Sequence, residues 1–357
     1  MFGMQRVYEL PLARDYVRHW GVAEAVRELI QNAIDSESPF EYAQHGDTFS
    51  LFSRGARLDP ATLVLGRSSK ADDDGAIGQF GEGYKLALVV LARCGLSVVV
   101  ENDSREWRPE FRKSKQFGIE TMHIIDSAME EGIDGLRFVI RGLNDDHQQS
   151  IKDSCLLMQE PMDDAVETYM GRLLPSRPGK LYVGGLYVCD TDMEFGYDFK
   201  PEHVTLERDR STISGWDLKW KTKELLFLTG RMDDVAEMME RGAKDTEYAH
   251  YNAPEMVKDA CYRHFQKKYP GHVAVKTKEE LDELIERGMT KVVQVNAGFH
   301  SAVSESAGYR SGGFAVIPQV PAEVLRDWYE ANKKYMSRLP QVAFKALIKR
   351  AEEWRNK

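Results

Sequence analysis

The feature that most constrains this chain is an amphipathic helix that carries an acid, an amide and a second acid on one side. Residues 28–35 read Glu-Leu-Ile-Gln-Asn-Ala-Ile-Asp, so Glu28, Asn32 and Asp35 project from one stripe of a helix with 3.6 residues per turn. The opposite stripe is apolar and contains Val22, Val26, Leu29, Ile30 and Ala33. We therefore expect a core-facing helix whose polar rim can hold a magnesium ion and a water beside a phosphate.

A glycine cluster about forty residues later supplies a complementary feature. It reads Gly78-Gln79-Phe80-Gly81-Glu82-Gly83-Tyr84-Lys85 and runs directly into an apolar helical stretch at residues 86–91. Glycines permit close backbone approach, and the free N–H groups at a helix start attract anions. Either feature alone is also typical of a solvated helix face or a flexible loop. In this order and at this distance, the two together predict a nucleotide site.

These residues resemble the GHKL ATPase superfamily (gyrase, heat-shock chaperone, histidine kinase and MutL), and the layout is closest to the MutL, Morc and chaperone branches. Glu28-x-x-x-Asn32-Ala33-x-Asp35 is similar to the N-box of that superfamily. Residues 65–70 and 77–85 are similar to its ATP lid and second glycine box. The resemblance covers roughly residues 10–142. It implies a Bergerat-type nucleotide-binding fold that takes ATP and Mg²⁺.

The resemblance also implies a role for each matched side chain. Glu28 would be the general base that activates the attacking water, and Asn32 would be the Mg²⁺ ligand. Asp35 would contact the nucleobase or a water bound to it. Lys85 is either a phosphate contact or an ordinary surface lysine, and the sequence leaves both open. The residues implied to contact the nucleotide are Asn32, Asp35, Ser53, Gly55, Ser68, Ser69, Lys70, Gly78, Gln79, Phe80, Gly81, Glu82, Gly83, Tyr84 and Lys85.

The sequence departs from the superfamily at two places near the expected adenine pocket. The superfamily has Asp-x-Gly-x-Gly after its first strand, whereas this chain has Ser53-Arg54-Gly55-Ala56-Arg57. A Gly-Thr pair of the superfamily is matched here by Gly135-Leu136, without the hydroxyl group. Ser53 can still make one hydrogen bond, directly or through water. Adenine specificity is therefore left open.

The local patterns of the first region, residues 1–145, indicate alternating helices and strands. We expect helices at 22–36 and 82–93 and a short helix at 60–65. We expect strands at 48–53, 96–101, around 107–111, at 120–125 and at 136–141. Helices on one face of a mixed sheet would give an α+β fold, a two-layer α/β sandwich.

The second region, residues 146–240, is predicted to be a transducer-like α/β domain. Residues 179–188 form an apolar hairpin pattern around a Gly-Gly turn, and a helix is expected at 215–228. In related branches a second domain donates a basic residue to the γ-phosphate. Arg208 or Arg210 resembles that residue, and the alternative is an exposed loop with internal Arg–Asp pairs.

The third region, residues 241–357, resembles no family. It is predicted to be mixed α/β and mostly helical, with a strand–helix–strand pattern at 272–276, 278–287 and 291–295 and a Ser/Gly-rich loop at 301–313. Two helices end the chain, and the last, from Pro340, carries an apolar stripe that is typical of core or of a partner helix. The stripe consists of Phe344, Leu347, Ile348, Ala351 and Trp354. We expect this region to contact a protein partner.

Composition is typical of a cytoplasmic protein. The chain has 357 residues, 48 basic and 57 acidic side chains and a net charge of −9, which disfavours a surface that coats nucleic acid or membrane. The four cysteines are scattered, which favours free thiols over disulfides or zinc. The stretch at 86–100 is too short and interrupted to span a bilayer. Direct nucleic-acid binding through a local basic groove is left open.

Three functions compete at this point. The first is a slow, Mg²⁺-dependent ATPase that acts as a conformational switch, with dimerisation on ATP expected by analogy to the superfamily. The second is a module that binds a nucleotide or another ligand without hydrolysis and regulates a partner; Ser53 motivates it. The third, a protein kinase, is disfavoured because no helix pair with a phospho-acceptor histidine precedes residue 28.

Overall fold

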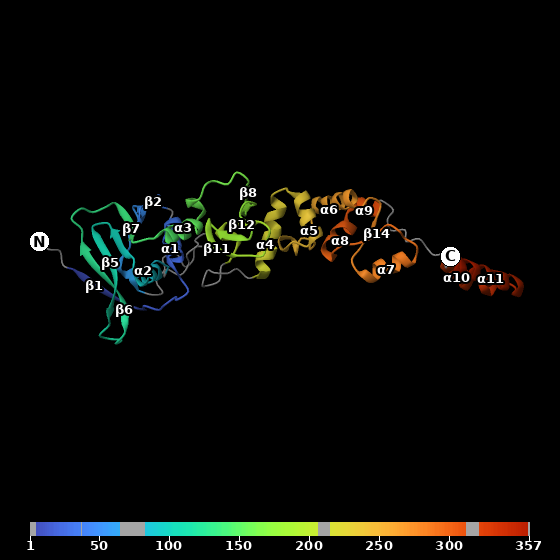
Figure 1. The fold of residues 1–357 in the computed structure, drawn as a ribbon, viewed down its shortest axis with the longest axis horizontal. Helices are drawn as coiled ribbons and strands as arrows, with labels where there is room; N and C mark the ends of the chain where they lie inside the picture. The colour runs from blue at the N-terminus through green and yellow to red at the C-terminus, as the bar shows by residue number, and fades with distance from the viewer. Residues whose placement is uncertain (1–4, 37, 65–82, 206–214, 312–320, 356–357) are drawn as a thin grey trace. The chain divides into compact units, whose positions relative to one another are not determined.

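The computed structural model describes residues 5–36, 38–64, 83–205, 215–311 and 321–355 (Figure 1). The chain divides into two compact units, residues 1–221 and 222–357. The fold is mixed α/β, and most neighbouring strands are antiparallel. The finer division of the sequence into three regions stays a prediction.

The first unit contains a seven-stranded sheet in the order β1-β6-β5-β4-β7-β3-β2. Every neighbouring pair in this sheet is antiparallel, so the expectation of a mixed sheet is wrong. The reason is that short turns join β2 to β3, β4 to β5 and β5 to β6, and short turns join only antiparallel strands. The strands are β1 (Arg6–Ala13), β2 (Phe40–His45), β3 (Thr48–Arg54), β4 (Ser97–Asn102), β5 (Arg105–Lys113), β6 (Glu120–Ala128) and β7 (Gly135–Arg141).

Helices cover one face of this sheet, as Figure 1 shows for α1 and α2. The helices of this layer are α1 (Val22–Asp35), α2 (Gly83–Arg93), α3 (Asp145–Asp153) and the short 3₁₀ turn η1 (Pro60–Leu63). α1 packs against both α2 and α3, and α2 contacts β4 and β5. In β3, Phe49 and Leu51 alternate inward and join the apolar stripe of α1 in one core. The two-layer arrangement expected from the sequence is present in this coarse form.

The opposite face of the sheet carries polar side chains in register. Arg137 on β7 donates to Glu101 on β4 at 2.7 Å, and its guanidinium lies 4.9 Å from the centroid of the Phe52 ring on β3. These three residues are cross-strand neighbours. Cross-strand pairs of this kind stabilise a sheet face that is not covered by helices.

A second, five-stranded sheet in the order β11-β10-β12-β9-β8 follows α3 in the first unit. Its strands are β8 (Val166–Thr168), β9 (Gly171–Leu174), β10 (Lys180–Val183), β11 (Leu186–Asp190) and β12 (Gly196–Phe199), and the 3₁₀ turns η2 (Leu156–Met158) and η3 (Pro201–His203) flank it. The hairpin β10–β11 is confirmed. Its turn residues Gly184 and Gly185 have φ of +59° and +79°, the region that a tight two-residue hairpin turn requires. Leu186 of β11 lies in the core cluster that also contains the buried residues of α1 and of the first sheet.

The second unit is mostly helical, as expected. Its helices are α5 (Met232–Arg241), α6 (Glu255–Lys268), α7 (Lys278–Glu286), α8 (Ala297–Glu305), α9 (Ala307–Ser311), α10 (Pro321–Asn332) and α11 (Arg338–Arg355), with the 3₁₀ turns η4 (Lys244–Thr246) and η5 (Lys333–Tyr335). α4 (Gly215–Leu228), which the sequence predicted, crosses the boundary between the units. α5, α6 and α8 pack together around the fully buried rings of Phe265 and Phe299.

Two predictions in this unit have opposite outcomes. The strand–helix–strand pattern is confirmed: β13 (Val273–Val275) and β14 (Val292–Gln294) are parallel neighbours joined through α7. The Ser/Gly-rich loop predicted at 301–313 is wrong over its described part, because α8 ends at Glu305 and α9 covers Ala307–Ser311; residues 312–313 lie outside the described residues. Asn296 caps α8 by accepting from the N–H of Phe299 at 2.9 Å, and Phe299, Ala302 and Val303 bury one face of the helix; both stabilise it despite its serines and glycine.

The apolar stripe of the last helix packs on the helix before it. The ring of Phe344 on α11 stacks on Trp328 of α10, with 4.7 Å between centroids, and Ile348 is buried. Leu347 remains about half exposed. The prediction of a contact with a neighbouring helix is therefore confirmed for Phe344, while a protein partner stays a prediction.

All four cysteines are free; Cys155 and Cys261 are buried and Cys94 is exposed. Among the helices of the described ranges, none has the length and apolar character that crossing a membrane requires.

Candidate functional site

Helix α1 carries the three residues on which the sequence prediction depends. The carboxylate of Glu24 accepts from the N–H of Gly21 at 2.7 Å and fixes the start of the helix. Glu28 is fully buried, and its Oε1 lies 3.5 Å from Nη2 of Arg27. Asn32 and Asp35 follow on the same stripe and are partly exposed. The helix therefore places one buried acid and two more accessible polar groups along one line.

The side-chain amide of Asn32 is oriented by its own helix. Its Nδ2 donates to the carbonyl oxygen of Glu28 at 2.8 Å. This contact uses the NH₂ group and leaves Oδ1 as the atom that can ligate a cation. In the part of the chain that the structure describes, no group of three or more His, Cys, Asp or Glu side chains could hold a metal ion. A single amide oxygen nevertheless suits Mg²⁺, which commonly takes one or two protein ligands and completes its shell with phosphates and waters.

Ser53 lies where the second half of the pocket was expected. It is 5% exposed and lies on the same helix-facing side of β3 as Phe49 and Leu51. Gly135 on the neighbouring strand β7 pairs with Arg54, the residue after Ser53. It has a φ of +155°, and a Cβ built on it would lie 2.5 Å from the carbonyl oxygen of Ser53. A glycine at 135 is thus required for β7 to approach β3 at Ser53.

The loop after β3 is held by a residue that sequence reasoning missed. The side chain of Asn102 accepts from the N–H of Leu58 at 3.0 Å and donates to its carbonyl oxygen at 2.8 Å. The N–H of Gly55 donates to the carbonyl oxygen of Asp134 at 3.1 Å. These contacts fix the backbone that follows Ser53. No spacing in the sequence links residue 102 to residue 58, so only the fold reveals this clamp.

The start of α2 brings Gly83, Tyr84 and Lys85 to the same helical layer. The expectation that Lys85 could be a surface residue is wrong, because its side chain is fully buried. Its Nζ donates to the carbonyl oxygens of Thr62 and Val64 at 2.8 and 3.0 Å. Lys85 therefore ties α2 to the backbone just before residue 65. Its phosphate contact stays a prediction.

Tyr84 makes a parallel link. Its hydroxyl lies 2.8 Å from Oγ1 of Thr62, and burial raises the pKa of the phenol to about 12. The neutral phenol and the lysine together anchor η1 to α2. This is a structural function that the glycine-box pattern did not indicate.

Several predicted site residues lie outside the described residues. They are Ser68, Ser69, Lys70, Gly78, Gln79, Phe80, Gly81 and Glu82 in the expected lid and glycine box, and Arg208 and Arg210 in the second region. The roles implied for them stay predictions.

The described part of the predicted site is brought together by packing. α1 lies against α2 and also contacts β3. The elements that carry Glu28, Asn32, Ser53 and the first turn of α2 thus adjoin one another in one core, although these residues lie far apart in sequence. That these groups meet at one ligand stays a prediction.

Arg27 is the other residue that sequence reasoning missed. Its Nη1 donates to the carbonyl oxygen of Tyr187 on β11 at 3.1 Å, while its Nη2 faces Glu28. The residue is 7% exposed. One buried guanidinium thus connects the predicted general base to the second sheet. A basic residue next to the N-box was visible in the sequence, but its partner on β11 was not.

Comparison with known proteins leaves the family of this chain unassigned. No protein-family profile matches the sequence. A protein of Mycoplasma pneumoniae described as uncharacterized is 23% identical over 213 residues, which cover 55% of this chain and 86% of that protein. Because that protein has no stated activity, function has to be inferred from the chemistry of the site.

Proposed function

We propose that this protein binds ATP with Mg²⁺ and hydrolyses it slowly as a conformational switch of the GHKL type, with a Bergerat-type first domain. The observation that supports the proposal is the packing of α1, the helix that carries Glu28 and Asn32, against α2, the helix that begins at Gly83. A helix start and a nearby amide are suited to polyphosphate. The order of the two boxes in the sequence supports the same function.

In this proposal each side chain has a defined task. Glu28 accepts a proton from the attacking water, and the Arg27 ion pair orients its carboxylate. Asn32, held by its contact with the carbonyl of Glu28, presents Oδ1 to the cation. Bound Mg²⁺ would neutralise phosphate charge. Ser53, which is buried on β3, offers one hydrogen bond to the nucleobase, where the superfamily has a carboxylate.

The second candidate is a module that binds nucleotide without hydrolysing it. Ser53 supports it, because a hydroxyl supplies a weaker and less selective contact than a carboxylate. Nucleotide-driven dimerisation and lid closure across residues 68–78 belong to the first candidate by analogy only.

The deciding experiment compares Glu28→Gln with Glu41→Gln, an exposed glutamate on β2 that serves as the matched control. Glutamine keeps the size of the side chain but cannot act as a base. We expect Glu28→Gln to bind MgATP within about threefold of the wild type in calorimetry and to lose at least about 100-fold in phosphate release. Glu41→Gln should retain both.

The two candidates predict different outcomes. Wild-type protein that binds MgATP but releases no phosphate would favour the non-hydrolysing module. Absence of any nucleotide binding would refute both. Unchanged ATP turnover in Glu28→Gln would show that Glu28 is not the general base.

A further inference from the structure

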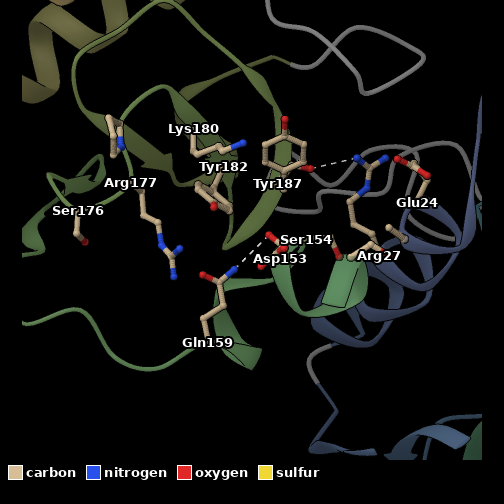
Figure 2. A pocket seen from close by; sticks show the side chains of 13 residues that line it. Glu24, Arg27, Asp153, Ser154, Gln159, Ser176, Arg177, Lys180, Tyr182 and Tyr187 are labelled. Carbon is tan, nitrogen blue, oxygen red and sulfur yellow. Dashed lines mark hydrogen bonds between the residues drawn. The ribbon is translucent and has the colours of Figure 1, made fainter. Parts of the chain in front are cut away.

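A cavity of about 580 Å³ lies in the first unit between α1, α3 and the hairpin β10–β11 (Figure 2). Its size falls within the range of roughly 300–1,000 Å³ that small-molecule sites occupy. Ala23, Glu24 and Arg27 of α1 line it, whereas Glu28, Asn32 and Asp35 do not. The cavity is therefore separate from the proposed nucleotide site, although both use α1.

Five charged side chains line the cavity. Arg27 faces Glu28, and the carboxylate of Asp153 accepts from Nε2 of Gln149 at 2.9 Å. Glu24 caps α1 through Gly21, and Lys180 pairs with Asp190 at 2.6 Å. Arg177 has no ion pair with any residue in the described ranges, and it extends into the cavity opposite Arg27 in Figure 2. Its guanidinium can take a carboxylate or phosphate through two parallel hydrogen bonds.

The upper wall of the cavity in Figure 2 is aromatic. The rings of Tyr182 and Tyr187 meet edge to face with 5.8 Å between centroids, and Tyr182 is only 3% exposed. Burial raises the pKa of both phenols, so both rings are neutral at physiological pH. Tyr187 is the less buried of the two, and Nζ of Lys180 lies 5.4 Å from its ring centroid. The accessible part of this neutral aromatic wall therefore lies beside a cation, which suits a ligand that joins an aromatic ring to an anionic group.

We propose that this cavity binds a small molecule that carries one anionic group, a carboxylate or a phosphate, on an aromatic body. Arg177 holds the anionic group, and Tyr182 and Tyr187 contact the ring. Nothing in this assignment depends on ATP.

The cavity is connected to the proposed catalytic acid through Arg27, a consequence that does rest on the proposed function. Arg27 lines the cavity and also lies 3.5 Å from Glu28. An anion in the cavity attracts this guanidinium away from Glu28. Because the ion pair orients Glu28, an occupied cavity slows hydrolysis while MgATP stays bound.

The test uses the full chain and calorimetry with three probes: phenyl phosphate, benzoate and inorganic phosphate. The variant is Arg177→Ala, and the matched control is Arg141→Ala, an exposed arginine at the end of β7 outside the cavity. We expect one of the two ring-bearing probes to bind, to weaken about tenfold or more in Arg177→Ala, and to keep its affinity in Arg141→Ala. Which of the two binds identifies the anionic group.

Inorganic phosphate tests the aromatic part of the proposal. It should bind at least about tenfold more weakly than the ring-bearing probe that binds, because it lacks the ring that contacts the tyrosines. Asn32→Ala should keep probe binding, which excludes binding at the proposed nucleotide site. The proposal is overturned if neither ring-bearing probe binds, if Arg177→Ala binds the probe like the wild type, or if inorganic phosphate binds as tightly as the ring-bearing probe that binds.

The link to Glu28 is read separately, from phosphate release with MgATP in the presence and absence of the bound probe. Slower release at unchanged MgATP affinity supports the link, and an unchanged rate refutes it. Failure of the proposed function appears as no release in any condition, whereas failure of the cavity proposal appears as no probe binding in calorimetry. The two failures are therefore distinguishable.

Discussion

Replacing Gly135 by alanine tests the close approach of β7 to β3 at Ser53. The new Cβ would lie 2.5 Å from the carbonyl oxygen of Ser53 and 2.8 Å from the Phe52 ring, so the strands have to separate. Overpacking of this kind costs about 1–3 kcal/mol. A φ of +155° is a region nearly reserved for glycine, which adds about 1–3 kcal/mol of backbone strain. We expect Gly135→Ala to lower the local free energy of unfolding by roughly 2–6 kcal/mol.

The matched control for this prediction is Gly95→Ala. Gly95 also has a positive φ, +78°, but a Cβ there would meet nothing within 4 Å. It should therefore cost only the backbone strain of the left-handed region, about 1–2 kcal/mol. The difference between the two variants isolates the steric contact at Ser53.

The assay is native-state hydrogen exchange of peptides from β3 and β7, which reports the opening free energy of these strands without requiring two-state unfolding of the whole chain. Gly135→Ala should accelerate exchange in both strands, and Gly95→Ala should change it less. If the two variants destabilise β3 and β7 equally, the close approach at Ser53 does not constrain the sheet.

Two further predictions concern the frame of the proposed site. Asn102→Ala should destabilise the loop after β3 by about 1–3 kcal/mol, because it removes both hydrogen bonds to Leu58; the Leu58 amide should exchange faster, and unchanged protection would contradict the clamp. Burial raises the pKa of Tyr84 to about 12, so between pH 10 and 12 the unfolded chain loses this proton while the folded protein keeps it, and stability falls as pH rises. At pH 11 the free energy of unfolding is lower by about 1.4 kcal/mol for this reason. Urea unfolding at pH 9 and pH 11 measures the difference, and Tyr84→Phe should lack it. Equal pH dependence of the wild type and Tyr84→Phe would refute the raised pKa.

Local patterns in the sequence predicted most elements of the first sheet. α1 and β3 were found with nearly their observed ends, because burial of one face imposes the 3.6-residue and two-residue periods. β1 and β2 were missed, since they are edge strands with few buried side chains and carry a weak alternating pattern. β1 pairs with β6, which lies far along the chain, whereas β2 pairs with the adjacent β3 across a short turn.

The candidate site divides in the same way. Glu28, Asn32 and Asp35 were grouped from their spacing alone, because one helix fixes their relative directions. The carbonyl partners of Lys85 were not predictable, since they lie more than twenty residues earlier and are met only after η1 packs beside α2. A lysine at the start of a helix has no local signal that distinguishes a phosphate contact from a buried anchor.

The sequence by itself determined the periods of the elements and the composition of the polar stripe on α1, because both follow from the nearest neighbours along the chain. The tertiary structure decided which distant groups meet that stripe. Arg27 donates to the carbonyl oxygen of Tyr187, and the side chain of Asn102 accepts from the N–H of Leu58. Gly135 allows the backbone of β7 to lie close to the carbonyl oxygen of Ser53. No local pattern in the sequence encodes these three long-range contacts. Contacts of this kind depend on how the strands and helices pack, and packing is set by the summed burial of the whole core.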